Sequence, residues 1–578
     1  MNAALAALLC LIVYALGYRF YSAYLATKIF ALSDDHVTPA HAQEDGVDYV
    51  PTNKWVLFGH HYASIAGLGP LLGPAIAVIW GWAPAMLWVV GGALLVGCVH
   101  DFGALVVSMR ARGQSIGKVT ESVIGPRAKS LFHLIIFFLV ALAMGVFAKV
   151  MAALFSPATA ANPVGYPQAV IPSASLMILA TVIGTLVYKK GFRLVPLTVL
   201  AFILVLGSIP LGMNEGVLAF TGLNEVGRAP STDGWSWLLL IYAFAASVLP
   251  VWLLLQPRDF LNSLLLYLGM AAMFLGFFVL NPQFDAPAYQ PHPDGAPSIF
   301  PFVFITIACG AASGFHGLVS SGTSSKQIAR EPDARMVGYG GMVGESLLGL
   351  MAVLATTAGF GDATRWHEHY ASWGAAGGLA QKIDAFIQGA GLFISQFGLP
   401  LGASQSFVAL LVVSFALTSM DSGTRLLRYN IAEIAETLNL PWLGHRVVAS
   451  LGAVAAIGFF CFFKINGKPA GLALWAIFGT SNQLLASLTL LVVSLYLLQR
   501  GRNALPTLLP MLFMMVSTGV AMAGQLRDFW AKDTMLLFGL CLGLLIMALW
   551  LIFEALLAFR RYQSGQTTES LQVEFKAG

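Results

Sequence analysis

The sequence predicts an all-α protein that crosses a membrane about fifteen times, and its composition, its apolar runs and its loop charges all lead to this fold class. Of the 578 residues, 58% are hydrophobic and only 10% are charged, with a mean hydropathy of +0.77. Soluble domains carry about 25% charged residues. Apolar runs near the roughly 20 residues that a membrane-spanning helix needs recur along the whole chain. We therefore treat the chain as a polytopic membrane protein.

Fifteen apolar runs meet this length rule. Their approximate limits are 3–27, 58–80, 82–109, 129–152, 171–188, 194–213, 236–256, 260–280, 300–320, 336–358, 403–424, 445–463, 471–497, 504–522 and 534–559. The first run lacks the basic residues that precede the core of a cleavable signal, so we expect it to remain as the first membrane helix. For the shorter segment 381–397, a full crossing and a re-entrant or interfacial helix both stay open.

Lysine and arginine gather in the loops that follow the odd-numbered runs. Examples are Arg110 after the third run, Lys326 after the ninth and Arg500 after the thirteenth. The alternate loops, such as 213–235 and 281–298, contain almost no lysine or arginine. Because basic residues in short loops are retained in the cytoplasm, this alternation predicts a periplasmic N-terminus and a cytoplasmic C-terminus.

Composition also argues against several other classes of protein. The formal net charge of +4 is small, and nucleic acid is not an expected partner. The five cysteines lie in apolar runs without CxxC spacing, and the HExxH motif of metalloproteases is absent. We therefore expect no enzyme activity, no catalytic residue, no metal and no cofactor. A receptor that binds its ligand without moving it across the membrane is the rival class.

The runs divide into two halves of similar length and opposite direction. Runs two to six begin inside the cell and runs seven to eleven begin outside, which is typical of an inverted-repeat transporter. The predicted parts are a first helix and loop at 1–57, a first repeat at 58–213, a second repeat at 214–424, and C-terminal helices at 425–578 that serve as a scaffold or in oligomer formation. A homo-oligomer is one expected partner arrangement.

The stretch from residue 59 to residue 74 predicts a broken helix. It is apolar enough for the membrane, yet it contains four glycines besides two prolines and adjacent histidines. Unwound backbone inside a bilayer persists only where it lines a protein cavity. We therefore expect a substrate site here, with contributions from His61, Ser64, Gly67, Gly69 and Gly73.

A matching break is expected at the start of the second half. Pro250 lies in the middle of the seventh run, close to Ser247. Both residues are candidates for the same substrate site, although a single proline often does no more than kink a helix.

Several ionisable side chains lie inside the apolar runs, where they are costly and usually functional. The candidates for proton coupling are His61, His100, Asp101, His316 and Glu345. Histidine changes its charge between pH 5 and 8, so a buried histidine beside a carboxylate can take up and release a proton. For His100 and Asp101, a structural tie between helices is the alternative.

A hydroxyl cluster near the end of the ninth run offers a second coupling ion. Ser320, Ser321 and Thr323, together with free carbonyls, would hold a Na⁺ ion beside the first broken helix. The alternative is a serine- and threonine-rich helix end that caps itself at the cytoplasmic surface.

Five strings resemble the carbon starvation protein A (CstA) family of inner-membrane transporters. They are Gly67 to Pro74 with Trp80, Gly97 to Phe102, Ser313 to Thr323, Thr418 to Tyr429, and Phe478 to Leu485. The resemblance implies uptake of pyruvate during carbon starvation by proton symport, with short peptides as the other substrate and Na⁺-coupled carboxylate symport as a further alternative. It also implies a LeuT-like core of five plus five helices in the bacterial inner membrane.

Overall fold

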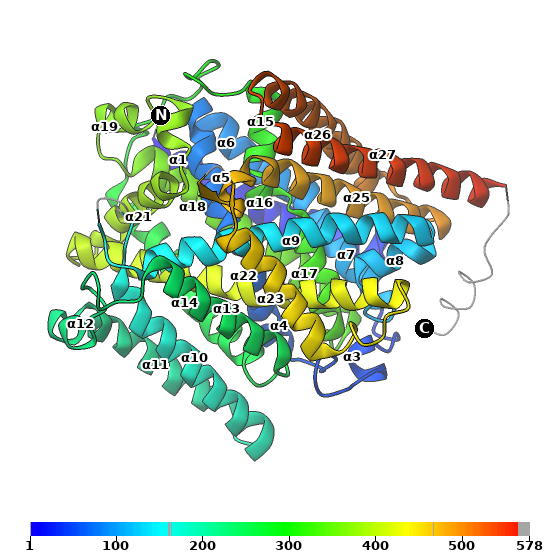
Figure 1. Cartoon of the computed structure of the whole chain (residues 1–578), viewed down its shortest axis with the longest axis horizontal. Coiled ribbons are helices and arrows are strands. Elements are labelled where there is room, and N and C mark those ends of the chain that lie inside the picture. Colours follow the sequence, from blue (N-terminus) through cyan, green and yellow to red (C-terminus); the bar gives the residue numbers. More distant parts are fainter. Residues whose placement is uncertain (1, 160–161, 163, 466, 565–578) are drawn as a thin grey trace.

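The computed structural model describes residues 2–159, 162, 164–465 and 467–564, and helices dominate this part of the chain (Figure 1). Eleven described helices are long and apolar enough to cross a membrane, and twelve are if the bent pair Lys54–Ile65 and Gly69–Trp80 forms one crossing. The chain is therefore a multi-pass membrane protein.

The helices occur in the following order along the chain. The first set is α1 (Ala3–Leu16), α2 (Ser22–Tyr24), α3 (Pro39–Ala42), α4 (Lys54–Ile65), α5 (Gly69–Ala77), α6 (Trp82–Leu87), α7 (Cys98–Arg110), α8 (Ile116–Val123) and α9 (Pro126–Phe155). The second set is α10 (Val170–Gly184), α11 (Leu194–Met213), α12 (Glu215–Thr221), α13 (Thr232–Val248), α14 (Leu255–Leu280), α15 (Ile299–Thr306), α16 (Ala308–Ala311), α17 (Gly314–Gly322) and α18 (Gly341–Ala358).

The third set begins in the loop after α18. It comprises α19 (Ala363–His369), α20 (Trp373–Ala376), α21 (Leu379–Ser395), α22 (Leu401–Thr437), α23 (Arg446–Phe462), α24 (Ala470–Ala473), α25 (Phe478–Gln499), α26 (Leu505–Ala531) and α27 (Met535–Gln563). Two short antiparallel strands, β1 (Lys464–Ile465) and β2 (Lys468–Pro469), lie between α23 and α24.

Tighter or wider helical turns join several of these helices. The π-helical turns are Gly17–Tyr21, Leu25–Ile29, Trp88–Gly97, Thr185–Lys189 and Arg335–Gly340, and the 3₁₀ turns are Val78–Trp80, Pro167–Ala169, Ser324–Lys326, Glu331–Asp333 and Trp475–Ile477. The π turns extend α1 to Ile29, join α6 to α7 and lead into α18, so each of these spans is longer than its α-helical part.

All fifteen predicted runs overlap helices, but three of them do not form long spans. The seventh run becomes α13 and the twelfth becomes α23, and each of these helices has only 17 residues. The ninth run is divided into α15, α16 and α17. Within the described residues, the count of fifteen long spanning helices is therefore not reached, because apolar length in the sequence does not guarantee an uninterrupted helix.

The first broken helix is confirmed. α4 ends at Ile65 and α5 begins at Gly69, and the two axes differ by 49°. Ala66 leaves the helical conformation with φ −72° and ψ 63°. Pro70, at the start of α5, has no backbone N–H to continue the hydrogen-bond ladder of α4. The break therefore follows from local sequence.

The second break differs from the prediction. α13 ends at Val248, and Leu249 is extended, as a residue before proline prefers to be. The chain then turns and starts α14, and the combined length of 17 + 26 = 43 residues is twice that of one crossing. Pro250 thus separates two helices. The interruption in the second half lies instead at Ala312 and Ser313, between α16 and α17.

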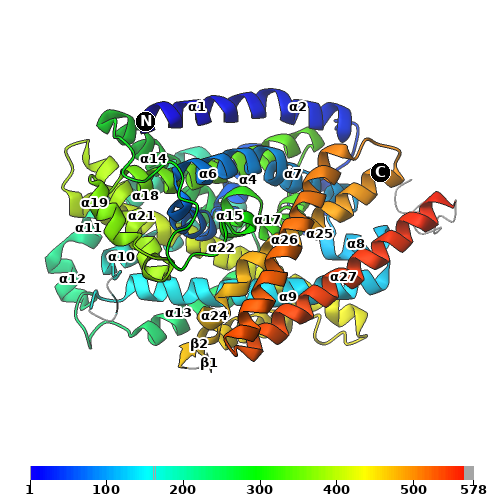
Figure 2. The ribbon, with the colours of Figure 1, turned by 90° about the horizontal axis from the view of Figure 1, so that it is seen from above.

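The two interrupted helices lie in the core of the protein. α5 packs against α16, while α17 packs against α7 and α25, and α22 packs closely against α9. Figure 2 shows α1 and α2 along one edge of the molecule and α27 along another side. Only 22% of the α27 span is buried, compared with 94% of the span that contains α25. α27 therefore faces outward, and α25 is a core helix.

Several of the loops with predicted cytoplasmic positions meet at one face. The segment 31–53 connects them, because Asp48 pairs with Arg425 at 2.8 Å and Asp34 pairs with Arg330 at 2.6 Å. We call this surface the basic face. It is formed by residues 31–53, by the loops after α7, α17 and α25, and by the end of α22. Near the start of α1, Asn2 bonds to Asn281 in one of the loops that lack basic residues.

Candidate transport site

A small cavity lies where the two interrupted helices meet. Its volume is about 20 Å³. It is lined by Ile65, Gly67, Gly69, Pro70, Ala143, Met144, Phe147, Cys309, Ser313, Phe315, His316, Ser419 and Phe478. A cavity of this size holds about one water molecule. The cavity is therefore too small for a larger solute unless the residues around it move apart.

The amino-terminal ends of two half-helices face this cavity. Gly69 and Pro70 begin α5, Ser313 and Phe315 lie at the start of α17, and all four line the cavity. The amide of Leu68 finds no hydrogen-bond acceptor among the described residues. Helix N-termini carry partial positive charge, so two of them at one cavity favour an anion.

Asn482 on α25 holds the second break in place. Its Oδ1 accepts a hydrogen bond from the Phe315 amide at 3.1 Å, and its Nδ2 donates to Ser313 Oγ at 3.0 Å. Its side chain is fully buried. Asn482 thus replaces the backbone hydrogen bonds that the break removes. Sequence reasoning did not select it as a site residue, although it lies in a string that carries the family resemblance.

His316 lies between two carboxylates that come from different helices. Its Nδ1 is 3.1 Å from Oδ2 of Asp101 on α7, and its Nε2 is 3.2 Å from Oε1 of Glu345 on α18. All three side chains are buried. One imidazolium cannot balance two buried carboxylates, so the cluster requires a further proton or cation to be neutral. His316 also lines the cavity, which places this charge imbalance next to the half-helix ends.

His100 joins the same cluster, whereas His61 does not. His100 Nδ1 is 2.7 Å from Asp101 Oδ1, so Asp101 lies between two histidines. His61 bonds through Nδ1 to Ser324 Oγ at 2.8 Å, and its Nε2 has no partner among the described residues. Of the five predicted proton-coupling residues, the structure therefore brings His100, Asp101, His316 and Glu345 together.

The residues predicted for substrate binding are divided by the structure. Gly67 and Gly69 line the cavity. Ser64 does not line it, but its carbonyl accepts a hydrogen bond at 2.9 Å from Ser419, which does. Gly73 lies farther along α5, where the absence of a side chain allows the backbone carbonyl of Thr306 to approach closely.

Ser247 and Pro250 are not brought to the cavity. Ser247 instead contacts Ser450 on α23 at 3.0 Å. The prediction failed here for the same reason as the prediction of the second break. This segment ends α13 and does not interrupt a helix in the core.

The predicted hydroxyl cluster mainly bonds to its own helix. Ser321 Oγ donates to the Gly317 carbonyl at 2.7 Å, and Thr323 Oγ1 donates to the Val319 carbonyl at 2.9 Å. Ser320 Oγ is buried without a partner among the described residues. Two of the three hydroxyls thus act as expected for a self-capping helix end.

A second buried charge network lies beside α4. His60 Nδ1 is 2.5 Å from Asp259, and Arg258 bonds to both Asp259 and Asp421. Tyr242 donates to Asp421 at 2.6 Å. The partner of Asp421 is therefore Arg258 rather than the neighbouring Arg425. Because arginine stays protonated in proteins, its charge here is fixed.

The fold and this site define a membrane transporter, with interrupted helices around a small cavity and a buried ionisable cluster on its wall. The family model of carbon starvation protein CstA matches residues 2–395 and 367–521. The chain belongs to this family.

Similarity to known proteins extends over most of the chain. The peptide transporter CstA of Bacillus subtilis is 32% identical over 563 residues, with 91% of each chain covered. The peptide transporter CstA of Helicobacter pylori strain J99 is 34% identical, with 86% of this chain and 79% of the relative covered. The pyruvate/proton symporter BtsT of Escherichia coli is 32% identical, with 89% and 80% covered.

Solved structures show a more distant similarity. The crystal structure of MhsT in complex with L-phenylalanine matches with a TM-score of 0.45 at 14% identity, covering 87% of this chain and 99% of that one. A mutant of the manganese transporter of Eremococcus coleocola matches with a TM-score of 0.39 at 13% identity, covering 90% and 99%.

Proposed function

We propose that this transporter takes up a small carboxylate, with pyruvate as the substrate, together with a proton. The observation that carries the proposal is the position of His316. It lies between Asp101 and Glu345 and also lines a cavity that faces two half-helix N-termini. The N-termini supply the positive potential for a carboxylate, and the cluster supplies a group that exchanges a proton.

The binding position follows from the helix ends. A carboxylate between α5 and α17 would accept hydrogen bonds from amides such as that of Leu68, and it would need no arginine. Gly67 and Gly69 would let the backbone approach the substrate closely because they carry no side chain. Opening of the cavity on one side and then the other would give alternating access.

Proton coupling gives uptake of a monoanion a thermodynamic advantage. A pyruvate anion entering alone works against the membrane potential, which costs about 2.3 kcal/mol per charge per 100 mV. An accompanying proton makes the step electroneutral. The cluster of His100, Asp101, His316 and Glu345 would carry this proton, because its two buried carboxylates are neutral only when protons on the cluster balance their charge.

The orientation in the inner membrane is part of the proposal. Lysine and arginine of the basic face would lie in the cytoplasm. Asn2 would then lie near the periplasmic side, and the C-terminus would be cytoplasmic. The division into two inverted repeats of five helices and the involvement of the last helices in a homo-oligomer also stay predictions.

Proteoliposomes test the substrate and the coupling ion in one preparation. We expect radiolabelled pyruvate to accumulate when a proton gradient is directed inward, and to equilibrate without accumulation when the gradient is collapsed by an ionophore. Accumulation that ignores the proton gradient but follows a Na⁺ gradient would overturn proton coupling and favour the hydroxyl cluster around Ser320.

Short peptides are the second candidate substrate, because two of the relatives described above are named peptide transporters. Radiolabelled dialanine in the same vesicles provides the comparison. If dialanine accumulates and pyruvate neither accumulates nor competes, the proposal of a carboxylate substrate is wrong while the proposal of a transporter stands.

A further inference from the structure

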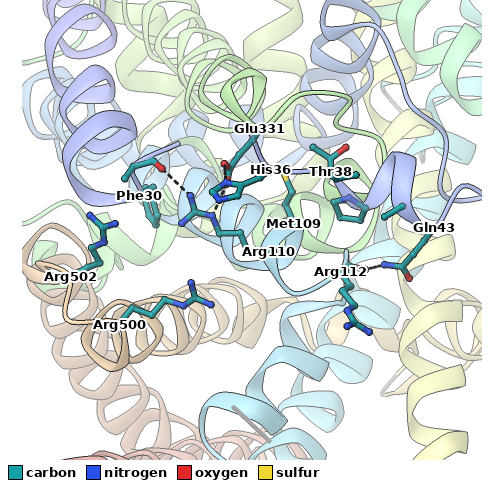
Figure 3. Close-up of a pocket in the computed structure, with 14 residues that line it drawn as sticks. Phe30, His36, Thr38, Gln43, Met109, Arg110, Arg112, Glu331, Arg500 and Arg502 are labelled. Atoms are coloured by element: carbon teal, nitrogen blue, oxygen red, sulfur yellow. Dashed lines mark hydrogen bonds and ion pairs between the residues drawn. The ribbon is translucent and has the colours of Figure 1, made fainter. Parts of the chain in front are cut away.

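A second, much larger cavity opens on the basic face, and it shares no lining residue with the transport cavity (Figure 3). Its volume is about 610 Å³, within the range of about 300–1,000 Å³ that is typical of small-molecule sites. It lies among the segment 30–43, the end of α7, Glu331 and the loop after α25. None of these residues takes part in the proposed transport step.

Four arginines and one carboxylate line this cavity. The arginines are Arg110, Arg112, Arg500 and Arg502, and the carboxylate is Glu331. Figure 3 shows that Arg500 and Arg502 come from the loop after α25, whereas Arg110 and Arg112 come from the other wall. The formal charge of these five groups is therefore strongly positive, and the cavity attracts anions.

Glu331 is fully occupied by its own partners. Its Oε1 accepts a hydrogen bond from Arg110 Nε at 2.6 Å. Its Oε2 lies 2.5 Å from His36 Nδ1 and accepts the Ser33 amide at 3.0 Å. The side chain is buried. Glu331 therefore fixes the inner wall of the cavity and does not neutralise the other arginines.

The charges of Arg112 and Arg502 have no acidic counter-ion in the described part of the chain. Neither Arg112 nor Arg502 has an acidic side chain within 4.0 Å there, and both side chains are exposed. Desolvation holds the pKa of Arg500 below its ordinary value; Tyr496 opposes this shift, and the charges of Arg110 and Arg502 add to it. Several like charges thus converge on one volume, an arrangement that a bound anion would stabilise.

The cavity wall also has an apolar side. Phe30, Val37 and Met109 contribute carbon surface to the lining. A ligand with a charged group and an attached apolar or glycerol part fits this division. Arginine forks bind phosphate oxygens in pairs, which distinguishes a phosphate group from a small halide.

We propose that this cavity binds a phosphate-bearing anion through Arg112, Arg500 and Arg502. The phosphate belongs to the headgroup of an anionic phospholipid or to a soluble phosphate compound, since both present the same chemistry to the three guanidinium groups. This site is independent of the carboxylate site between α5 and α17.

Thermal unfolding of the full-length protein in nanodiscs tests the proposal. One arm compares phosphatidylcholine alone with phosphatidylcholine that contains one fifth phosphatidylglycerol. The other arm adds inorganic pyrophosphate to phosphatidylcholine nanodiscs, with potassium chloride of equal ionic strength as the reference. We expect at least one probe to raise the unfolding temperature by about 2 °C or more. A response to the lipid alone identifies a headgroup site, and a response to pyrophosphate alone identifies a soluble ligand.

Two variants make the test specific. Arg112→Gln combined with Arg502→Gln should lose most of the shift, and its fold is expected to survive because neither side chain leaves a described partner unpaired. The single variant Arg502→Gln should lose part of it. The matched control is Arg446→Gln, an exposed arginine at the start of α23, which should keep the full shift. An unchanged shift in the double variant, or no shift with either probe in the natural protein, would overturn the proposal.

Discussion

Glu345 lies 3.2 Å from His316 through Oε1, and both of its oxygens lack a hydrogen bond of good geometry with any described residue. A fully buried carboxylate in this condition is costly unless it is protonated or gains a partner during the functional cycle. Asp101 differs, because each of its oxygens faces a histidine. Glu345 is thus the least satisfied member of the cluster, and we expect it to be the one that exchanges the proton.

Glu345→Gln should uncouple uptake from the proton gradient. Glutamine keeps the shape of the side chain but cannot release a proton. We expect the proton-driven accumulation of pyruvate in proteoliposomes to be lost, so that internal pyruvate does not rise above the external concentration. Exchange of external for internal pyruvate, which needs no net proton movement, should continue.

The matched control is Glu368→Gln, which removes an exposed carboxylate on α19. It should accumulate pyruvate like the natural protein. Normal accumulation by Glu345→Gln, in vesicles where the control is also normal, would show that the coupling proton is held elsewhere.

Gly67→Ala should interfere with the central cavity. A Cβ atom at position 67 would lie 2.6 Å from Ser419 Oγ and 3.1 Å from Phe147 Cε2. Ser419 holds the carbonyl of Ser64, so its displacement disturbs the first break. Overpacking of this kind costs about 1–3 kcal/mol. We expect slower pyruvate uptake at equal amounts of protein in the vesicle membrane.

Gly402→Ala is the control for this substitution. Gly402 lies at the start of α22, and no atom is within 4 Å of the place a Cβ would take. Uptake should be unchanged there. If Gly67→Ala also leaves the initial rate unchanged, the close packing at the first break does not matter for transport.

The first break, and the meeting of several basic loops at one face, could be predicted because their causes are local. Proline has no backbone N–H in any fold, so Pro70 predicts the end of the preceding helix. Loops with and without lysine and arginine alternate along the chain, and this alternation predicts which loops share a face. Asp48 and Arg425 show how such a face is assembled, since they meet from positions 377 residues apart.

The second break could not be predicted because its cause is tertiary. No proline lies at the break around Ala312 and Ser313. The unwound backbone is held by Asn482, which belongs to a helix far along the chain. Pro250 carries the stronger local signal, but it ends a helix. The pairing of Arg258 with Asp421 is similar, because only the packing of α14 against α22 brings the two residues together.

Asn482→Leu should destabilise the protein. It leaves the buried Phe315 amide and the Ser313 hydroxyl without their partner, and an unsatisfied buried donor costs about 1–3 kcal/mol. We expect a lower unfolding temperature and slower uptake. Asn482→Asp keeps an acceptor for the Phe315 amide and should lose less stability than the leucine variant. A leucine variant as stable as the natural protein would mean that other groups hold the second break.

The free energy of unfolding should depend on pH because of Asp48, whose ion pairs hold the segment 31–53. Burial would raise the pKa of Asp48, but Arg425, Arg428 and Lys326 outweigh this effect and hold the pKa well below its ordinary value. A carboxyl group whose pKa is lowered by folding stabilises the folded state above its unfolded pKa of about 3.9. This contribution decreases as the pH falls below that value towards the folded pKa.

Asp48→Asn should therefore cost the most stability near neutral pH and progressively less below about pH 4. Its upper bound is the cost of breaking a buried ion pair, about 3–5 kcal/mol. Thermal unfolding of both proteins in detergent between pH 7 and pH 3 measures the difference. Asp35→Asn is the control, because Asp35 is exposed on the same segment and no described cation pairs with it. A cost for Asp48→Asn that stays constant over this range would show that the arginines do not act on Asp48 through its charge. The segment would then be held by neutral contacts, such as the bond of the Trp252 indole, between α13 and α14, to the Gly46 carbonyl.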